Sequence, residues 1–117
     1  MTSYPINPVP KPRMTQRDKW AKRPPVLRYF AFCDEVRAHG IKLENGGEHI
    51  VFKVPMPKSW SKIKQAKMEG SPHQQRPDID NYLKALLDAF FKDDSEVWDI
   101  RATKIWSKTG SIEINQS

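Results

Sequence analysis

The chain has 117 residues, of which 38% are apolar and 29% charged, and this composition fits a single soluble domain over residues 1–117. It contains no apolar run of about 18 residues and no apolar segment near its N-terminus, which argues against a membrane span and a secretory signal. A single cysteine, Cys33, excludes an internal disulfide and suits a reducing cytoplasm.

The net charge of +6 is unevenly distributed. Residues 1–76 hold 15 Lys and Arg against 6 Asp and Glu, net +9, whereas residues 77–117 hold 5 against 8, net −3. A basic surface favours a polyanionic partner, and nucleic acid is the usual one. No long basic amphipathic helix supports an anionic membrane. Composition alone leaves a merely solubilising basic surface as an equal alternative.

The N-terminal third is predicted to hold an extended segment, a loop and a helix. Residues 4–10 alternate apolar positions with three prolines, which is typical of a sheet edge. Residues 11–24 are basic and predict an exposed loop. A helix should begin at Pro24-Pro25, run to about His39 and end at Gly40. Its apolar positions form a wide arc, so we expect much of this helix, including Cys33, to be buried.

The middle of the chain predicts a turn at 45–47 and a strand over 49–54, which Pro55 and Pro57 close. Residues 58–69 predict a short cationic helix that ends at Gly70. A loop follows over 71–77. We interpret His73 as part of this polar loop rather than as a zinc ligand, because no cysteine or second nearby histidine completes a site.

The C-terminal third predicts a central helix, two strands and a tight turn. The helix covers about residues 78–91, with a core stripe formed by Ile79, Tyr82, Leu83, Leu86, Leu87 and Phe90. After an acidic turn, residues 97–106 predict a strand, 107–110 a hairpin turn and 111–115 the returning strand. Helices and strands that do not strictly alternate favour an α+β fold, with a small mixed sheet packed against two main helices.

Two carboxylates at the mouth of the central helix form the most informative motif. Asp78 and Asp80 are two residues apart, so in an extended approach both can point toward one ion. Mg²⁺ prefers oxygen ligands and is commonly held by one or two carboxylates plus substrate phosphates. The alternative is that Asp80 is only a helix N-cap, worth about 1 kcal/mol.

The lysine and the acidic pair that follow leave two interpretations open. Lys84 is four residues after Asp80, so it either forms a surface ion pair worth about 0.3–0.5 kcal/mol or meets a phosphate. Asp93-Asp94 is either a solvated turn or returns one carboxylate to the first two aspartates. Three convergent carboxylates on a basic protein would indicate metal-assisted phosphodiester hydrolysis, and spacing alone makes this as plausible as the alternatives.

The pattern D-x-D-N-x-x-K-A-x-x-D-A over residues 78–89, preceded by Arg76-Pro77 and followed by Asp93-Asp94 and the strand Arg101–Lys104, resembles the RusA family. These are Holliday junction resolvases, small Mg²⁺-dependent endodeoxyribonucleases (crossover junction endodeoxyribonucleases) of DNA recombination and repair that are common in bacteriophages. The resemblance implies that Asp78, Asp80 and Asp94 bind metal and that Lys84 acts on the scissile phosphate.

The resemblance further implies a homodimer that cuts four-way DNA symmetrically, in the cytoplasm of a bacterial or phage-infected cell, with Mg²⁺ as the cofactor and Mn²⁺ as a possible substitute. Two alternatives are a broader nuclease that nicks forks and flaps, and a DNA-binding protein without catalysis. Only four residues separate Asp88 from Asp93, so the helix must end abruptly for Asp94 to reach the site.

The basic segments are the predicted DNA contacts, because phosphate contacts give affinity without sequence choice. The candidate residues are Lys11, Arg13, Arg17, Lys19, Lys58, Lys62, Lys64 and Arg76. Trp20 and Trp60 lie among the cationic residues. Either could stack on an unpaired base, although packing against the core is the more common role.

Overall fold

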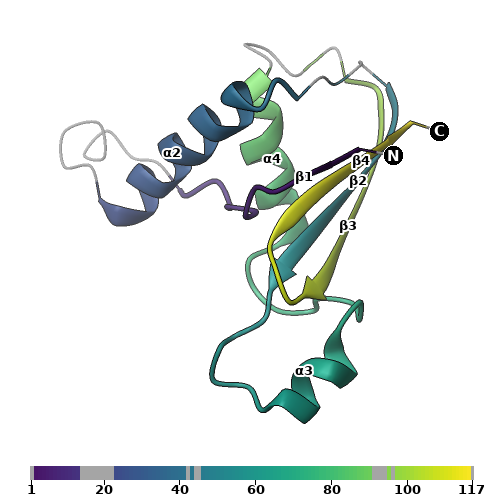
Figure 1. Cartoon of the computed structure of the whole chain (residues 1–117). Helices are drawn as coiled ribbons and strands as arrows, with labels where there is room; N and C mark the ends of the chain where they lie inside the picture. Colours follow the sequence, from purple (N-terminus) through teal and green to yellow (C-terminus); the bar gives the residue numbers. More distant parts are fainter. Residues whose placement is uncertain are drawn as a thin grey trace.

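The computed structural model describes residues 2–13, 23–41, 43, 46–90, 95 and 97–116 (Figure 1). The elements in these residues are β1 (Thr2–Tyr4), α2 (Pro24–Ala38), β2 (Gly46–Pro55), α3 (Lys62–Met68), α4 (Ile79–Phe90), β3 (Asp99–Ser107) and β4 (Ser111–Gln116). They form a mixed sheet with packed helices, which confirms the predicted α+β class. None of the described helices is long and apolar enough to cross a bilayer.

The strands lie in the order β1-β4-β2-β3, with β2 and β3 parallel and β4 antiparallel to both β1 and β2. The predicted hairpin over 97–115 is therefore wrong, because β2 lies between β3 and β4, and the turn joining them crosses the end of β2. Alternation identifies a strand but not its neighbour. The predicted edge segment 4–10 is a strand only at Tyr4, since β1 ends before Pro5, which lacks an N–H for the ladder.

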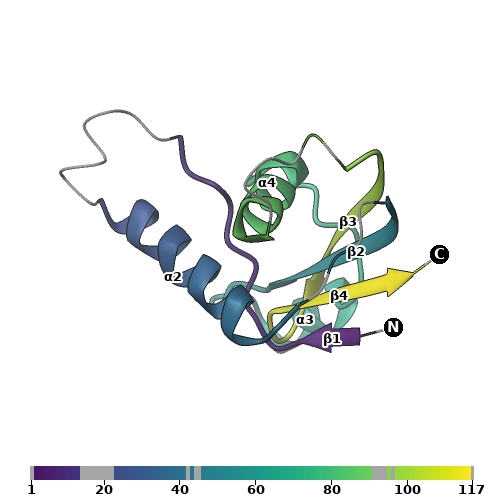
Figure 2. The same cartoon turned by 90° about the horizontal axis from the view of Figure 1, so that it is seen from above.

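The core lies between one face of the sheet and the helices α2 and α4, which cover that face together (Figure 2). The Phe52 ring from β2 stacks on Tyr82 from α4 with a centroid separation of 5.6 Å. Leu86 of α4 and Ile112 of β4 are fully buried in the same cluster. Burial of each such side chain stabilises the fold by about 1.5–3 kcal/mol, so this layer fixes the position of α4 on the sheet.

Helix α2 begins at the predicted prolines and ends just before Gly40, whose φ of 62° suits a glycine. The expectation that much of this helix is buried is confirmed for one side, which includes Cys33, and is wrong for the other side. Leu27 and Phe30 remain 48% and 46% exposed, because α2 packs mainly against α4, through one stripe that joins the core cluster. That buried stripe consists of Val26, Tyr29, Phe32, Cys33 and Val36.

Helix α3 confirms the predicted short cationic helix, and it buries none of its own residues. It is attached through Trp60, whose ring lies 4.8 Å from that of Trp106 on β3. On the same indole, the His73 ring packs with a centroid separation of 4.2 Å and is only 4% exposed. The predicted place of His73 in the loop over 71–77 is confirmed, but its burial was not foreseen, because that burial depends on a tryptophan 33 positions later in the chain.

Candidate active site

The start of α4 presents two carboxylates to solvent. The main-chain carbonyl of Asp78 accepts hydrogen bonds from the N–H groups of Asn81 (3.1 Å) and Tyr82 (3.4 Å), and so begins the helix. Asp80 lies inside the first turn, which excludes the N-cap role considered for it and places its carboxylate where the helix dipole favours negative charge. Both aspartates are exposed, and neither forms an ion pair within the described part of the chain.

A lysine from β3 holds the segment that enters α4. The Lys104 Nζ donates to the carbonyl oxygens of Gln75 at 2.6 Å and Pro77 at 2.8 Å. Its own carbonyl accepts a hydrogen bond from the His73 N–H at 3.1 Å. The residue immediately before Asp78 is thereby tied to the sheet. The sequence placed Lys104 in a strand that is part of the family pattern, but it did not predict the hydrogen bonds to Gln75 and Pro77.

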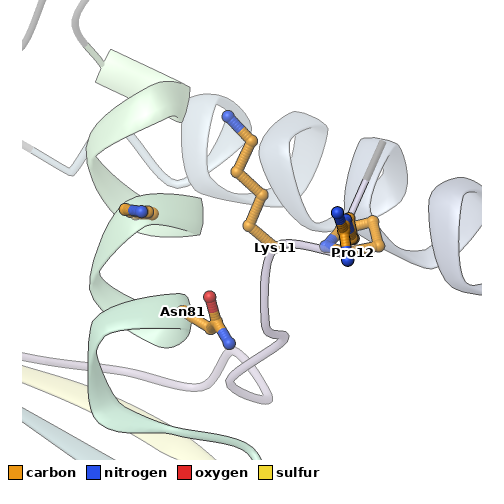
Figure 3. Close-up of a pocket in the computed structure, with 5 residues that line it drawn as sticks. Lys11, Pro12 and Asn81 are labelled. Carbon is orange, nitrogen blue, oxygen red and sulfur yellow. The ribbon is translucent and has the colours of Figure 1, made fainter. Parts of the chain in front are cut away.

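Beside the first turns of α4 lies a cationic pocket of about 430 Å³. It is lined by Lys11, Pro12, Arg13, Asn81 and Lys84. Figure 3 shows Lys11 extending from the N-terminal segment alongside α4, with Asn81 projecting from that helix. The Lys11 N–H donates to the Asn81 carbonyl oxygen at 3.0 Å and so joins the two elements. With three cations and no acid in its lining, the pocket suits an anion such as a phosphate.

Asp88 has a different role from the first two aspartates. It lies two turns after Asp80 on α4, and its Oδ2 is 2.5 Å from the Lys11 Nζ and accepts a hydrogen bond from the Tyr29 hydroxyl at 3.1 Å. Burial, followed by the nearby Cys33 and Asp88, holds the pKa of Tyr29 well above its usual value, so the phenol keeps the proton that it donates. Asp88 therefore positions Lys11 at the edge of the pocket.

Lys84 lies in the pocket lining, and the described residues contain no ion pair between it and Asp80. This arrangement favours the phosphate-contacting interpretation of Lys84 over the helix-surface pair. Asp93 and Asp94 lie outside the described residues, so a carboxylate returning to Asp78 and Asp80 stays a prediction.

The predicted DNA-contacting residues separate into groups. Lys11 and Arg13 line the pocket with Lys84, whereas Arg76 is exposed two residues before Asp78. Lys58, Lys62 and Lys64 belong to the α3 region at one end of the sheet. Arg17, Lys19 and Trp20 lie outside the described residues. Trp60 packs on Trp106, so the prediction of a packing role for Trp60 is confirmed.

The donor chemistry of Asp78 and Asp80 fits a hard divalent cation. Within the described residues there is no group of three or more His, Cys, Asp or Glu side chains that could enclose a metal. Mg²⁺ needs no such enclosure, because it usually retains several waters and takes one or two carboxylates together with substrate phosphates. Asp78 and Asp80, which form no ion pair among the described residues, meet this requirement next to the cationic pocket, and Mn²⁺ accepts the same oxygen donors.

Comparison with known proteins places the chain in a family. The model of the family described as "Endodeoxyribonuclease RusA" matches residues 5–115. This chain belongs to the RusA family. It is also similar to "Uncharacterized protein YqaN" of Bacillus subtilis (strain 168), with 38% identity over 68 residues that cover 51% of this chain and 48% of that protein. The chain therefore spans about half the length of the curated relative it matches. No solved structure matches it.

Membership of the RusA family confirms the predicted resemblance. A nuclease of this class must bring a phosphate next to groups that stabilise negative charge. In this RusA-family chain, the pocket residues Lys11, Arg13 and Lys84 are suited to that task, and Asp78 and Asp80 begin the helix that lines the pocket.

Proposed function

We propose that this chain is a metal-dependent endodeoxyribonuclease that resolves four-way DNA junctions by symmetric phosphodiester hydrolysis, in recombination and repair. The observation that carries the proposal is the pair Asp78 and Asp80, two exposed carboxylates at the start of the helix that supplies Lys84 to the cationic pocket. A phosphodiester group suits this arrangement, because the pocket cations attract its oxygens and the two carboxylates could hold a metal beside it.

In the proposed mechanism, Asp78 and Asp80 would hold Mg²⁺ together with Asp94, the third carboxylate of the family pattern. The bound metal would supply polarisation of the phosphate and a lower pKa for the attacking water. Lys84 stabilises the negative charge that develops on the phosphate oxygens as water adds to phosphorus and the bond to the leaving oxygen breaks. Lys11 and Arg13, which the N-terminal segment adds to the pocket lining, hold the phosphate and orient it for attack.

Outside the pocket, DNA binding is proposed to extend along exposed cations. Arg76 lies beside the carboxylates, Lys58, Lys62 and Lys64 lie at the α3 end of the molecule, and Arg17 and Lys19 belong to the basic N-terminal segment. Contacts to phosphates position the duplex arms without selecting sequence. Binding should therefore weaken steeply with salt, and each removed cation should lower the slope of that dependence by about one.

A homodimer is proposed because a four-way junction has two-fold symmetry and two identical sites can then cut two opposed strands. Light scattering of the purified chain, alone and with a junction, measures this directly. A complex with one chain per junction would contradict symmetric resolution.

The test is cleavage of a synthetic four-way junction beside a replication fork, a flap and a linear duplex, each with Mg²⁺, Mn²⁺ or EDTA. Paired symmetric nicks in the junction that require metal and are lost in Asp80→Asn support the proposal. Equal cutting of forks and flaps would favour the broader branched-DNA nuclease. Tight junction binding without metal-dependent cutting would favour a DNA-binding protein without catalysis.

A further inference from the structure

A short basic segment around α3, residues 57–70, has features that neither the core nor the pocket uses. We call it the α3 lobe. Its lysines Lys58, Lys62, Lys64 and Lys67 are all exposed, and no acidic residue occurs between positions 58 and 68. In their midst, Ile63 is 73% exposed. An isoleucine that contributes little burial to the fold and lies among cations indicates a contact with an anionic partner that also offers apolar surface.

Contacts within the α3 lobe hold Ile63 and the surrounding lysines in place. A seven-residue helix is unstable alone, and here local contacts support it. The Ser61 hydroxyl accepts a hydrogen bond from the Lys64 N–H at 3.1 Å, and the Gln65 side chain donates to the Trp60 carbonyl at 2.9 Å. The Lys64 ammonium lies 4.2 Å from the Trp60 ring centroid, and that ring packs on Trp106.

The base of the α3 lobe lies next to the entrance of α4. Trp106, which anchors the lobe, and Lys104, which holds Pro77 before Asp78, are two residues apart on β3. Residues two apart on a strand share one face and are separated by roughly 6.5 Å. Figure 1 shows α3 beyond the end of the sheet where β2 and β3 finish, and the first turn of α4 is the end of that helix nearer to α3.

We infer that the α3 lobe is a wedge for branched DNA, in which the lysines bind backbone phosphates and Ile63 inserts against a base pair at the branch point and unstacks it. This inference rests on the proposed junction-resolving function. Apolar side chains such as Ile enter between base steps in proteins that distort DNA. DNA is favoured over a lipid surface, because one apolar side chain among four lysines offers too small an apolar face to bury in a bilayer.

The experiment is fluorescence of 2-aminopurine placed at the branch point of a four-way junction. It is carried out with the Asp80→Asn variant as the background, so that no cleavage contributes to the signal. We expect the background protein to brighten the probe, and the added Ile63→Ala change to reduce the brightening of the saturated complex to less than half. Adding Leu27→Ala instead, which truncates an exposed apolar residue on α2, should leave the signal unchanged.

The possible outcomes distinguish failure of the DNA wedge from failure of the proposed junction-resolving function. Full brightening by the Ile63→Ala protein at saturation would overturn the wedge and leave the nuclease proposal intact. Failure of the unmodified chain to bind any junction would overturn both. If Ile63→Ala instead abolished binding to anionic phospholipid vesicles while the 2-aminopurine signal persisted, the α3 lobe would be a membrane contact and not a DNA wedge.

Discussion

The Lys104 Nζ lies 2.8 Å from the carbonyl oxygen of Pro77, the residue that precedes Asp78. A second hydrogen bond of 2.6 Å joins the same ammonium group to the Gln75 carbonyl oxygen. Lys104 belongs to β3, which follows α4 in the chain, so the carboxylate pair is positioned by a strand formed from later sequence. Two kinds of contact therefore fix the start of α4 relative to the sheet: these hydrogen bonds and the packing of the apolar stripe of α4.

Replacing Lys104 with methionine should slow junction cleavage by about 10- to 100-fold, because a displacement of about 1 Å at a reacting centre costs on this order. The change removes both hydrogen bonds to the loop before Asp78 but keeps an aliphatic stem on β3. Single-turnover cleavage at saturating protein measures the effect. Lys108→Met, at an exposed lysine in the turn after β3, is the matched control. A Lys104→Met protein that cuts at the unmodified rate would show that the loop needs no such anchor.

Asp88→Asn should release Lys11 from its position at the pocket. The variant loses the carboxylate that contacts the Lys11 ammonium and the Tyr29 hydroxyl, so the free energy of unfolding should fall by about 1–3 kcal/mol. Junction affinity should fall as well, because Lys11 lines the pocket. Urea denaturation and salt-dependent binding measure the two effects. In a double-mutant cycle with Tyr29→Phe the stability losses should be non-additive, and simple additivity would mean that the two residues act independently.

His73 predicts a pH dependence of stability. Burial, and then the positive charge of Lys104, hold its pKa below the usual value, and its buried Nδ1 has no hydrogen-bond partner within the described residues. The unfolded chain therefore binds this proton more tightly than the folded protein. The stabilisation is complete above about pH 6.5 and is lost as the pH falls from there through the lower folded-state pKa.

His73→Phe should remove this loss while keeping a ring against Trp106. Urea denaturation at about pH 7.5 and about pH 5 measures the change in the free energy of unfolding, and the decrease on acidification should be smaller in the variant. His39→Asn, at an exposed histidine, is the control. An unchanged acid sensitivity in His73→Phe would show that other groups cause it.

Local sequence patterns predicted the helices and strands well and their neighbours poorly. The 3.6-residue period fixed α4 to within a residue at each end, because its apolar stripe is regular and packs directly on β2. The same kind of pattern predicted too much burial for α2, since a run of apolar residues does not reveal how many sides of a helix are covered. The hairpin prediction failed because β4 pairs with β2, which lies about 60 residues earlier in the chain.

Some residues of the candidate site could be recognised from local sequence, and others could not. Asp78, Asp80 and Lys84 occur within seven residues, so their spacing and family resemblance could be recognised directly. Lys11 and Arg13 come from the N-terminal segment, more than 65 positions from Asn81, and only the folded chain brings them to α4. Nothing in the local sequence around Lys104 or His73 indicates their contacts, which depend on long-range pairing between β3 and the segment before α4.

Whether Asp78 belongs to a metal-dependent nuclease site is decided by cleavage of a four-way junction with the unmodified chain and with Asp78→Asn, each with and without Mg²⁺. We expect paired symmetric nicks that need Mg²⁺, and a loss of more than about 100-fold in cleavage rate in Asp78→Asn, since residues that merely support metal ligands are already worth about 10–100-fold. Junction binding should persist in the variant. Cutting that continues in Asp78→Asn, or that is indifferent to Mg²⁺, would contradict the assignment of this aspartate to a metal-dependent nuclease site.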